Sequence, residues 1–401
     1  YIDGVKMSDP SSVSNDFDFN NILTSQVSRV EILKGNQSSI YGSGAIGGTI
    51  HITTKRGKPG FREDVNFSAG SHGTNNLSTS FSGGDENNNY YFGLQRFYTD
   101  GISQMYHNSE KDRYRNNGLV TSFSNKFSDT LEVQTNVRLA DTYLQYDAVC
   151  VSSLFGCSAS RDHSEEVDAI ESSANVSLIH KPMEKLTNKF TVANTYIERT
   201  YVAAPGSKNT LEDKYYGDRY AFLYQGNYNF DLDNSIVFGL EREDDQMGYN
   251  KDATGRINSS SYVTSQYFDY QSRITNNIYA TFGARFDDHS FAGNEDSHRA
   301  TLAYVFDNKA TKLKSSYGTG YRFPSLYEIF YVWNSRNNCN FGGSNCGDVG
   351  FRKAETSVGY DFGIEKTINS NLFIDLTYFN IEYNDALEGW EGNMGAGSGS
   401  T

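Results

Sequence analysis

Residues 219–230 read Arg-Tyr-Ala-Phe-Leu-Tyr-Gln-Gly-Asn-Tyr-Asn-Phe, and this stretch decides the fold. Every second residue from Tyr220 to Phe230 is aromatic or glycine, and the alternate positions, which begin with Arg219, include a glutamine and two asparagines. Successive residues of a β-strand point to opposite faces, so this segment has one apolar and one wetter face. The pattern therefore predicts a strand that separates an apolar environment from an aqueous one.

The same alternation recurs from about residue 62 onward, and we count about fifteen such segments, among them 131–139, 278–287 and 372–378. Their connections alternate between tight turns, such as 231–234, and long loops at about 143–166, 201–213, 247–259 and 324–353. Long strands with short turns on one side and long loops on the other are typical of outer-membrane barrels. The predicted fold class is all-β, a transmembrane antiparallel β-barrel.

Composition excludes several other classes of protein. The chain has 401 residues, a net charge of −14 and 29 tyrosines, and its mean hydropathy is −0.60. An acidic chain lacks the basic face that nucleic-acid binding needs. No stretch approaches the roughly 18 apolar residues of a transmembrane helix. A membrane crossing would therefore require a closed barrel, because open sheet edges are not tolerated in hydrocarbon.

Residues 1–60 have a different character. Val27 to Leu33 and Thr49 to Thr54 are predicted strands, and the glycine-rich stretch 41–48 lies between them. These glycines favour tight turns, since no Gly-Lys-Ser/Thr follows to make a phosphate-binding loop. The chain opens on Tyr1-Ile2-Asp3-Gly4 and closes on the Gly/Ser-rich stretch 395–401, so we expect it to be a fragment.

Two sets of residues resemble known motifs. Residues 1–5, 30–48 and 50–55 resemble the end of the plug domain of TonB-dependent outer-membrane receptors. The family usually has Arg-Gly-Pro where this chain has Lys34-Gly35-Asn36. Gly320 to Glu328 and Phe351 to Ser357 resemble later barrel motifs of the same family. The matching plug residues are Glu31, Lys34, Gly35, Tyr41, Gly42, Gly47 and Gly48.

The resemblance implies an architecture and a function. Residues 1–60 would be the C-terminal part of an α+β plug, and 61–401 would be about 15 of the 22 barrel strands. The protein would lie among the lipids of a Gram-negative outer membrane and take up a scarce, large ligand, powered by the TonB–ExbB–ExbD complex. It would be no enzyme and would require no cofactor. Cobalamin is slightly favoured as ligand, and a ferric siderophore is the alternative.

The segment 324–353 is our first choice for ligand binding, because aromatic side chains give a large contact area at low entropic cost. Interfacial packing explains these aromatics equally well. Haem receptors of the resembled family place a histidine in this region, and the resemblance therefore disfavours haem, since no histidine lies between Arg322 and Ser357. The predicted ligand-binding residues are Tyr327, Phe330, Tyr331, Trp333 and Phe341, and the arginines expected to face the plug are Arg138, Arg219, Arg285, Arg299 and Arg322.

Loop residues suggest two further features. Cys150 and Cys157 form one pair, and Cys339 and Cys346 form a second pair with the same spacing. Each pair lies among Ser, Gly and Asn with no second cluster of metal ligands nearby, which favours two local disulfides over free thiols. Asp141 and Asp147 resemble part of the calcium-binding loop region of the cobalamin transporter, and a solvated acidic loop is the competing interpretation.

Three rival functions come from other classes. A barrel enzyme would need a positioned catalytic set, and the best local cluster, His289 beside Asp287 and Asp288, stands in no nucleophile motif. A passive porin would not carry the plug motifs. A soluble β-rich adhesin would remain in solution without detergent.

Overall fold

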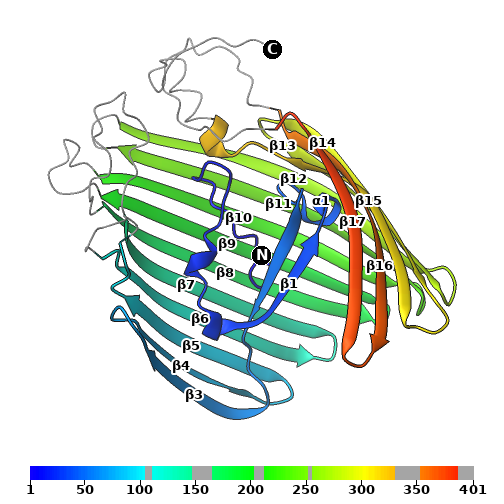
Figure 1. Ribbon diagram of the computed structural model, residues 1–401, viewed down its shortest axis with the longest axis horizontal. Helices are drawn as coiled ribbons and strands as arrows, with labels where there is room; N and C mark the ends of the chain where they lie inside the picture. The colour runs from blue at the N-terminus through cyan, green and yellow to red at the C-terminus, as the bar shows by residue number, and fades with distance from the viewer. Residues whose placement is uncertain (104–110, 147–164, 203–211, 252–254, 330–352, 387–401) are drawn as a thin grey trace, which may run out of the picture.

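The computed structural model describes residues 1–103, 111–146, 165–202, 212–251, 255–329 and 353–386. It contains a two-stranded antiparallel sheet near the N-terminus and a 15-stranded sheet that follows it (Figure 1). The 15 strands are hydrogen-bonded in strict sequence order from β3 to β17, and the outer edges of β3 and β17 pair with no other described strand. This arrangement confirms the predicted all-β fold class and strand count.

We call the N-terminal residues 1–54, which end with the second strand of the small sheet, the plug, after the domain that they resemble. Its two strands match the predicted ones and pair antiparallel, with Ile32 opposite Ile50. Its small apolar core, Ile2, Val5, Met7 and Ile52, packs against Ala193 and Ala221 of the barrel wall. The plug elements are 3-10 turns at Phe19–Asn21 and Thr24–Gln26, β1 (Val27–Lys34), the single turn α1 (Ser38–Tyr41) and β2 (Gly48–Thr54).

The barrel strands are long and antiparallel throughout. They are β3 (Gly60–Ala69), β4 (Asn75–Gly84), β5 (Asn88–Thr99), β6 (Tyr114–Ser128), β7 (Leu131–Tyr146), β8 (Glu165–Met183), β9 (Leu186–Val202), β10 (Glu212–Asn229), β11 (Asn234–Lys251), β12 (Gly255–Arg273), β13 (Ile278–His289), β14 (Gly293–Val305), β15 (Thr311–Arg322), β16 (Glu355–Asn369) and β17 (Leu372–Asn384).

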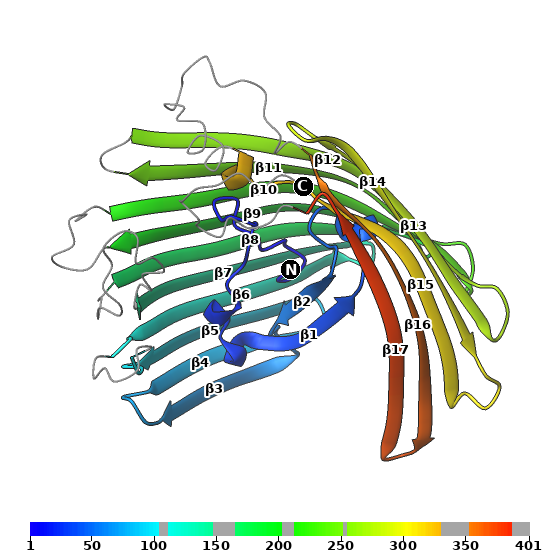
Figure 2. The same cartoon turned by 45° about the horizontal axis from the view of Figure 1, so that its top comes forward.

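The sheet curls around the plug, which lies on its concave side (Figure 2). On β10, Tyr220 and Phe222 face outward and are 44% and 53% exposed, whereas Arg219 and Ala221 face inward and are 4% and 7% exposed. An apolar outer face and a polar inner face suit a barrel wall between lipid and a filled lumen. No helix among the described residues is long and apolar enough to span a membrane.

Short turns and longer connections alternate as predicted, with one correction. We expected a long loop over 247–259, but β11 continues to Lys251 and β12 begins at Gly255. The strands here simply extend further, since 18 consecutive residues from Asn234 to Lys251 pair with β12. The polar and glycine residues of this stretch gave a loop signal that cross-strand pairing overrides.

Two of the tight turns share one hydrogen-bond design. Asp85 Oδ1 accepts from the backbone N–H groups of Asn87 and Asn88, at 2.8 and 2.7 Å. Asp231 Oδ1 accepts in the same way from Asp233 and Asn234, both at 2.8 Å. These backbone hydrogen bonds lower the pKa of both carboxyl groups.

This design predicts a pH effect on stability. Because the folded-state pKa values lie below the unfolded value of about 3.9, the turns stabilise the fold above that pH. The contribution is lost as pH falls through the folded-state values. We expect the urea midpoint of the full-length protein to fall less between about pH 6 and about pH 3 in D85N/D231N than in wild type. D129N, in a turn for which no such contact is seen among the described residues, should behave like wild type; equal slopes in all three proteins would contradict the prediction.

Candidate functional site

Arg285 on β13 contacts both the plug and two carboxylates of the barrel. Its guanidinium donates to Asp287 Oδ1 at 2.7 Å, to Glu241 Oε2 at 2.8 Å and to the backbone oxygen of Ile40 in the plug at 2.9 Å. The adjacent Gly42 has φ +71°, and a Cβ there would lie 2.8 Å from the guanidinium carbon. The plug therefore needs glycine at this position, both for its backbone conformation and for the approach of Arg285.

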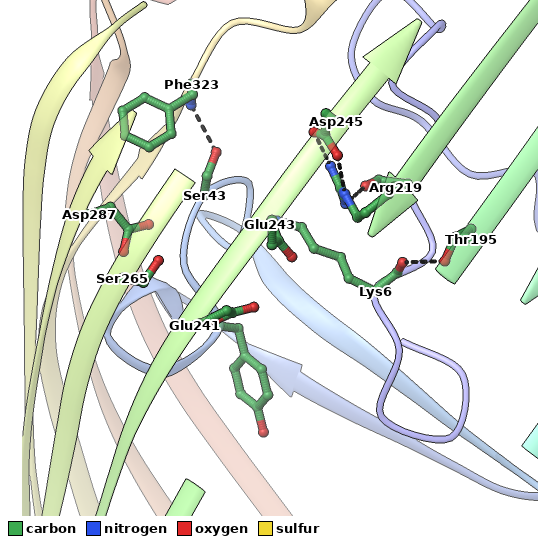
Figure 3. A network of polar contacts seen from close by, with 12 residues as sticks. Lys6, Ser43, Thr195, Arg219, Glu241, Glu243, Asp245, Ser265, Asp287 and Phe323 are labelled. Carbon is green, nitrogen blue, oxygen red and sulfur yellow. Dashed lines mark hydrogen bonds and ion pairs between the residues drawn. The ribbon is translucent and has the colours of Figure 1, made fainter. Parts of the chain in front are cut away.

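Arg219 on β10, three strands away from Arg285, makes the same kind of contact with the plug. It holds Asp245 with two hydrogen bonds, at 2.5 and 2.6 Å (Figure 3), and donates to the hydroxyl of Ser8 in the plug. Beside it, Lys6 of the plug pairs with Glu243 at 3.2 Å. Thr195 on β9 donates to the backbone oxygen of Lys6 at 3.4 Å.

Arg138 on β7 is the third arginine that pairs with a barrel carboxylate and also donates to the plug. It pairs with Glu171 at 3.0 Å and donates to the backbone oxygen of Asn21 in the plug, also at 3.0 Å. All three arginines are thus neutralised by a carboxylate of the barrel and offer their remaining donors to uncharged plug groups. A buried charge needs such a partner, because taking it out of water unpaired costs several kcal/mol.

Asp9 carries the other ion pair between plug and barrel. Its carboxylate lies 2.9 Å from the Arg199 guanidinium of β9 and accepts two hydrogen bonds from Ser11, at 2.8 and 2.6 Å. Burial raises the pKa of the Asp9 carboxyl, against the opposing effects of Arg199 and Ser11. Among the described residues, Asp9–Arg199 and Lys6–Glu243 are the only ion pairs that join plug to barrel.

The residues of the predicted plug motif form the strands and the turn of the plug. Glu31 pairs with Arg29 on the exposed face of β1, and Lys34 ends that strand. Asn36, where the resembled motif has proline, donates to Gly318 O at 2.7 Å and accepts from the Ser357 hydroxyl at 3.1 Å. Gly35 donates to Gly47 O at 3.1 Å, and a Cβ at Gly48 would lie 2.3 Å from Leu33 O.

Two cavities lie where the plug meets the barrel wall. One of about 470 Å³ lies between Tyr41, Ser43 and Ile50 of the plug and a wall that includes Phe323 and Leu326. The other, of about 930 Å³, lies between the plug segment 9–21 and strands β6 to β9. Both are of the size and mixed lining that ligand sites have.

A ladder of tyrosines stands on the inner wall beside these cavities, and we call Tyr201, Tyr215, Tyr249 and Tyr327 the tyrosine ladder. The ring of Tyr215 stacks on Tyr249 with centroids 4.5 Å apart, meets Tyr201 edge-on at 5.7 Å and lies 6.4 Å from Tyr327. The Arg199 guanidinium lies 5.8 Å from the Tyr215 ring centre. The same arginine therefore contacts both the ladder and Asp9 of the plug.

Only one of the predicted ligand-binding residues can be placed. Tyr327 belongs to the ladder, whereas Phe330, Tyr331, Trp333 and Phe341 lie outside the described residues. Sequence reasoning missed the other ladder members, because Tyr201, Tyr215 and Tyr249 lie on three different strands. Alternation puts Tyr215 on the same face of β10 as the inward Arg219, but cross-strand register was needed to align the three rings.

Every lysine and arginine that the described cavity linings contain is paired with a carboxylate. The four pairs are Lys6–Glu243, Arg199–Asp9, Arg219–Asp245 and Arg322–Glu328. Asp16 and Asp18 on the plug surface add negative charge to the lining. The described lining is therefore acidic overall.

The predicted disulfides lie wholly, and the predicted calcium site partly, outside the described residues. The cysteines Cys150, Cys157, Cys339 and Cys346 all lie outside the described residues, so both disulfides stay predictions. Asp147 lies outside them as well. Asp141 lies on β7 with its side chain 51% exposed, where it accepts from Asn117 at 2.9 Å and lies 3.5 Å from Arg115. Of the predicted calcium ligands, the structure thus describes only Asp141, an exposed carboxylate with Arg115 as its neighbour.

Three of the five predicted lumen arginines, Arg138, Arg219 and Arg285, contact the plug directly. Arg322 instead pairs with Glu328 and Glu355 of the barrel. Arg299 makes no hydrogen bond to the plug within the described ranges. An inward direction, which the sequence pattern gives, is therefore not sufficient for a plug contact.

Comparison with known proteins bears on this architecture. Residues 54–389 match the family "TonB dependent receptor-like, beta-barrel", and residues 1–49 match "TonB-dependent Receptor Plug Domain". The vitamin B12 transporter BtuB of Photobacterium profundum is 24% identical over 383 residues, covering 91% of this chain and 55% of that protein. An iron-regulated outer membrane virulence protein of Vibrio cholerae is 23% identical, covering 90% and 54%. The chain thus spans about half the length of these relatives.

A solved structure shows the same fold. The siderophore receptor PirA from Acinetobacter baumannii superposes with a TM-score of 0.74 at 15% identity, over 96% of this chain and 62% of that one. The barrel family covers most of the sequence, and its members are outer-membrane transport proteins rather than enzymes. The chain belongs to the TonB-dependent receptor family.

Proposed function

We propose that the protein takes up a bulky, uncharged ligand across the outer membrane, with cobalamin as the favoured candidate. The observation that carries this proposal is the charge of the cavities at the plug: within the described residues every lining cation has a carboxylate partner, and Asp16 and Asp18 form no ion pair. A ferric tris-catecholate carries three negative charges and needs unpaired arginine or lysine around it. Cyanocobalamin is neutral overall and presents many amide groups that tyrosine hydroxyls can bind.

The charges of the internal segments outside the described residues also favour an uncharged ligand. The internal segments outside the described residues contain five acidic residues, Glu110, Asp147, Asp162, Asp252 and Asp348, and four basic ones, Arg161, Lys208, Arg336 and Arg352. Their sum, 4 − 5 = −1, adds no net positive charge to compensate the acidic lining. The identity to a protein named as a vitamin B12 transporter agrees with this candidate.

A ferric siderophore receptor is the second candidate, supported by the fold shared with PirA and by the iron-regulated relative. Neutral ferric trihydroxamates would satisfy the charge argument as well as cobalamin does. A passive porin is disfavoured, because the plug fills the concave side of the sheet.

Uptake would draw energy from the TonB–ExbB–ExbD complex, and the plug interface suits such a step. Two ion pairs and a set of hydrogen bonds to uncharged groups hold the plug, so water can replace most contacts one at a time as it moves. The three neutralised arginines keep their barrel carboxylates when the plug leaves, which avoids exposing unpaired buried charges.

The test is binding by the full-length protein in detergent, measured by titration calorimetry. Cyanocobalamin, a ferric trihydroxamate and a ferric tris-catecholate would be compared, with and without a calcium chelator. We expect cyanocobalamin to bind and the tris-catecholate not to bind. Tight tris-catecholate binding would overturn the charge argument, and binding of the trihydroxamate alone would replace cobalamin by a neutral siderophore. Loss of binding on chelation would support calcium at Asp141 and Asp147.

A further inference from the structure

We infer that the plug segment 38–44 takes the place of β14 along the edge formed by residues 319–323, where β15 ends, and that this edge changes partner when the plug withdraws. The inference deepens the proposed function and rests on it, because it concerns how plug movement reshapes the ligand cavity.

The pairing of β14 with β15 stops halfway along the two strands. Cross-strand partners run from Val305 and Lys312 to Arg299 and Gly318, and no described strand pairs with β14 above that point on this side. The next backbone group of β14 is satisfied by a side chain instead: His298 N–H donates to the Thr319 hydroxyl at 3.0 Å. β15 nevertheless continues to Arg322, paired only with β16.

Plug groups bind the edge that β14 leaves free. Tyr321 O accepts from Gly44 N–H at 3.0 Å, and Tyr321 N–H donates to the Ser38 hydroxyl at 3.4 Å. Phe323 N–H donates to the Ser43 hydroxyl at 2.9 Å (Figure 3). Because alternate residues of a strand direct their N–H and C=O groups to the same side, Thr319, Tyr321 and Phe323 all face β14. Addition of an extended or looped segment to a strand edge is a recurring recognition mode.

The upper half of β14 is a second possible partner for this edge, because its residues continue the existing β14–β15 alignment. Continuing the Arg299–Gly318 alignment by two residues would bring Ser297 opposite Gly320, and by three would bring Asp296 opposite Tyr321. His298 N–H points toward β15, so the backbone of Asp296 points the same way by alternation. An unpaired strand edge binds whatever complementary backbone reaches it. Once Ser38, Ser43 and Gly44 leave, β14 is the nearest such backbone in sequence register.

The exchange would alter the ligand cavity. β15 leads directly into Phe323, Pro324 and Leu326, which line the smaller cavity, and into Tyr327 of the tyrosine ladder. Ser325 is also tied to the plug, since its hydroxyl donates to Val13 O at 2.8 Å. Plug withdrawal thus releases one wall of the cavity in the same step. By linkage, a ligand that binds the assembled wall holds the plug in place, and loosening the plug lowers ligand affinity by the same factor.

The test is amide hydrogen exchange on the full-length protein without ligand, comparing wild type with S38A/S43A. The variant removes both hydroxyl acceptors for β15 and should let β14 compete for the edge. We expect exchange in 294–298 to slow by about tenfold, while 319–323 stay protected, because pairing with β14 replaces pairing with the plug. S39A is the matched control, since Ser39 lies in the same turn and makes no hydrogen bond to β15 in the described structure.

Two results would overturn the inference. Faster exchange in 319–323 with unchanged 294–298 would mean that the freed edge frays, and unchanged exchange in both segments would mean that the plug hydroxyls do not hold the edge. Heat-modifiable migration in electrophoresis confirms that the variant is folded, and S43A alone serves as the milder variant. Since no ligand is present, failure here leaves the proposed ligand class standing, and failure of cobalamin binding leaves this inference standing.

Discussion

Replacing Arg285 by methionine is expected to lower the stability of the folded receptor by about 3–5 kcal/mol, the usual effect of removing one partner of a buried charge cluster. The side chain is 3% exposed, and its removal leaves Glu241 and Asp287 as buried carboxylates without their cation. It also removes the donor to Ile40 O, which ties the plug to β13. The measurement is urea unfolding of the full-length protein in detergent.

The chain offers a matched control for this change. Arg299 also faces the lumen, one strand away, but makes no hydrogen bond to the plug among the described residues. R299M should therefore cost far less than R285M. The triple variant R285M/E241Q/D287N, which removes the charges together, should recover most of the loss. An R285M protein as stable as R299M would show that Arg285 does not organise the interface.

Truncating Tyr215 to alanine is expected to weaken ligand binding by about 30-fold, the effect of losing an aromatic hot spot of about 2 kcal/mol. Tyr215 is the centre of the tyrosine ladder, since its ring contacts Tyr201, Tyr249 and Tyr327 and lies beside Arg199. Its loss removes the surface and lets its neighbours collapse into the gap. The measurement is the Kd of the ligand identified by the binding panel.

The neighbouring residue supplies the control. Tyr216 points to the opposite face of β10, where its hydroxyl donates to Asn258. Y216A should leave affinity within about twofold of wild type, and Y215F, which keeps the ring, should lose little. Equal losses in Y215A and Y216A would indicate a general disturbance of the strand and would remove the ladder from the ligand site.

The sequence alone determined the fold class and the family. Alternation with a period of two is a local property, so each barrel strand and its lipid-facing side could be read from consecutive residues such as 219–230. The two plug strands and the glycine-rich turn between them could also be predicted from consecutive residues. In 247–259 the polar residues predicted a loop, whereas cross-strand pairing extends β11 to Lys251 and lets β12 begin at Gly255.

Only the tertiary structure decided how residues distant in sequence combine. The inward arginines were predicted, but their carboxylate partners, such as Asp245 for Arg219 and Glu171 for Arg138, follow from strand register and could not be read from spacing. The tyrosine ladder depends on the same register across three strands. The plug residues Ser38 and Ser43 contact the end of β15 across about 280 positions of sequence, and no local pattern predicts such contacts. The alternation of residues along a strand determines which face of the sheet a side chain lies on. The register between strands and the docking of the plug determine which residues that side chain contacts.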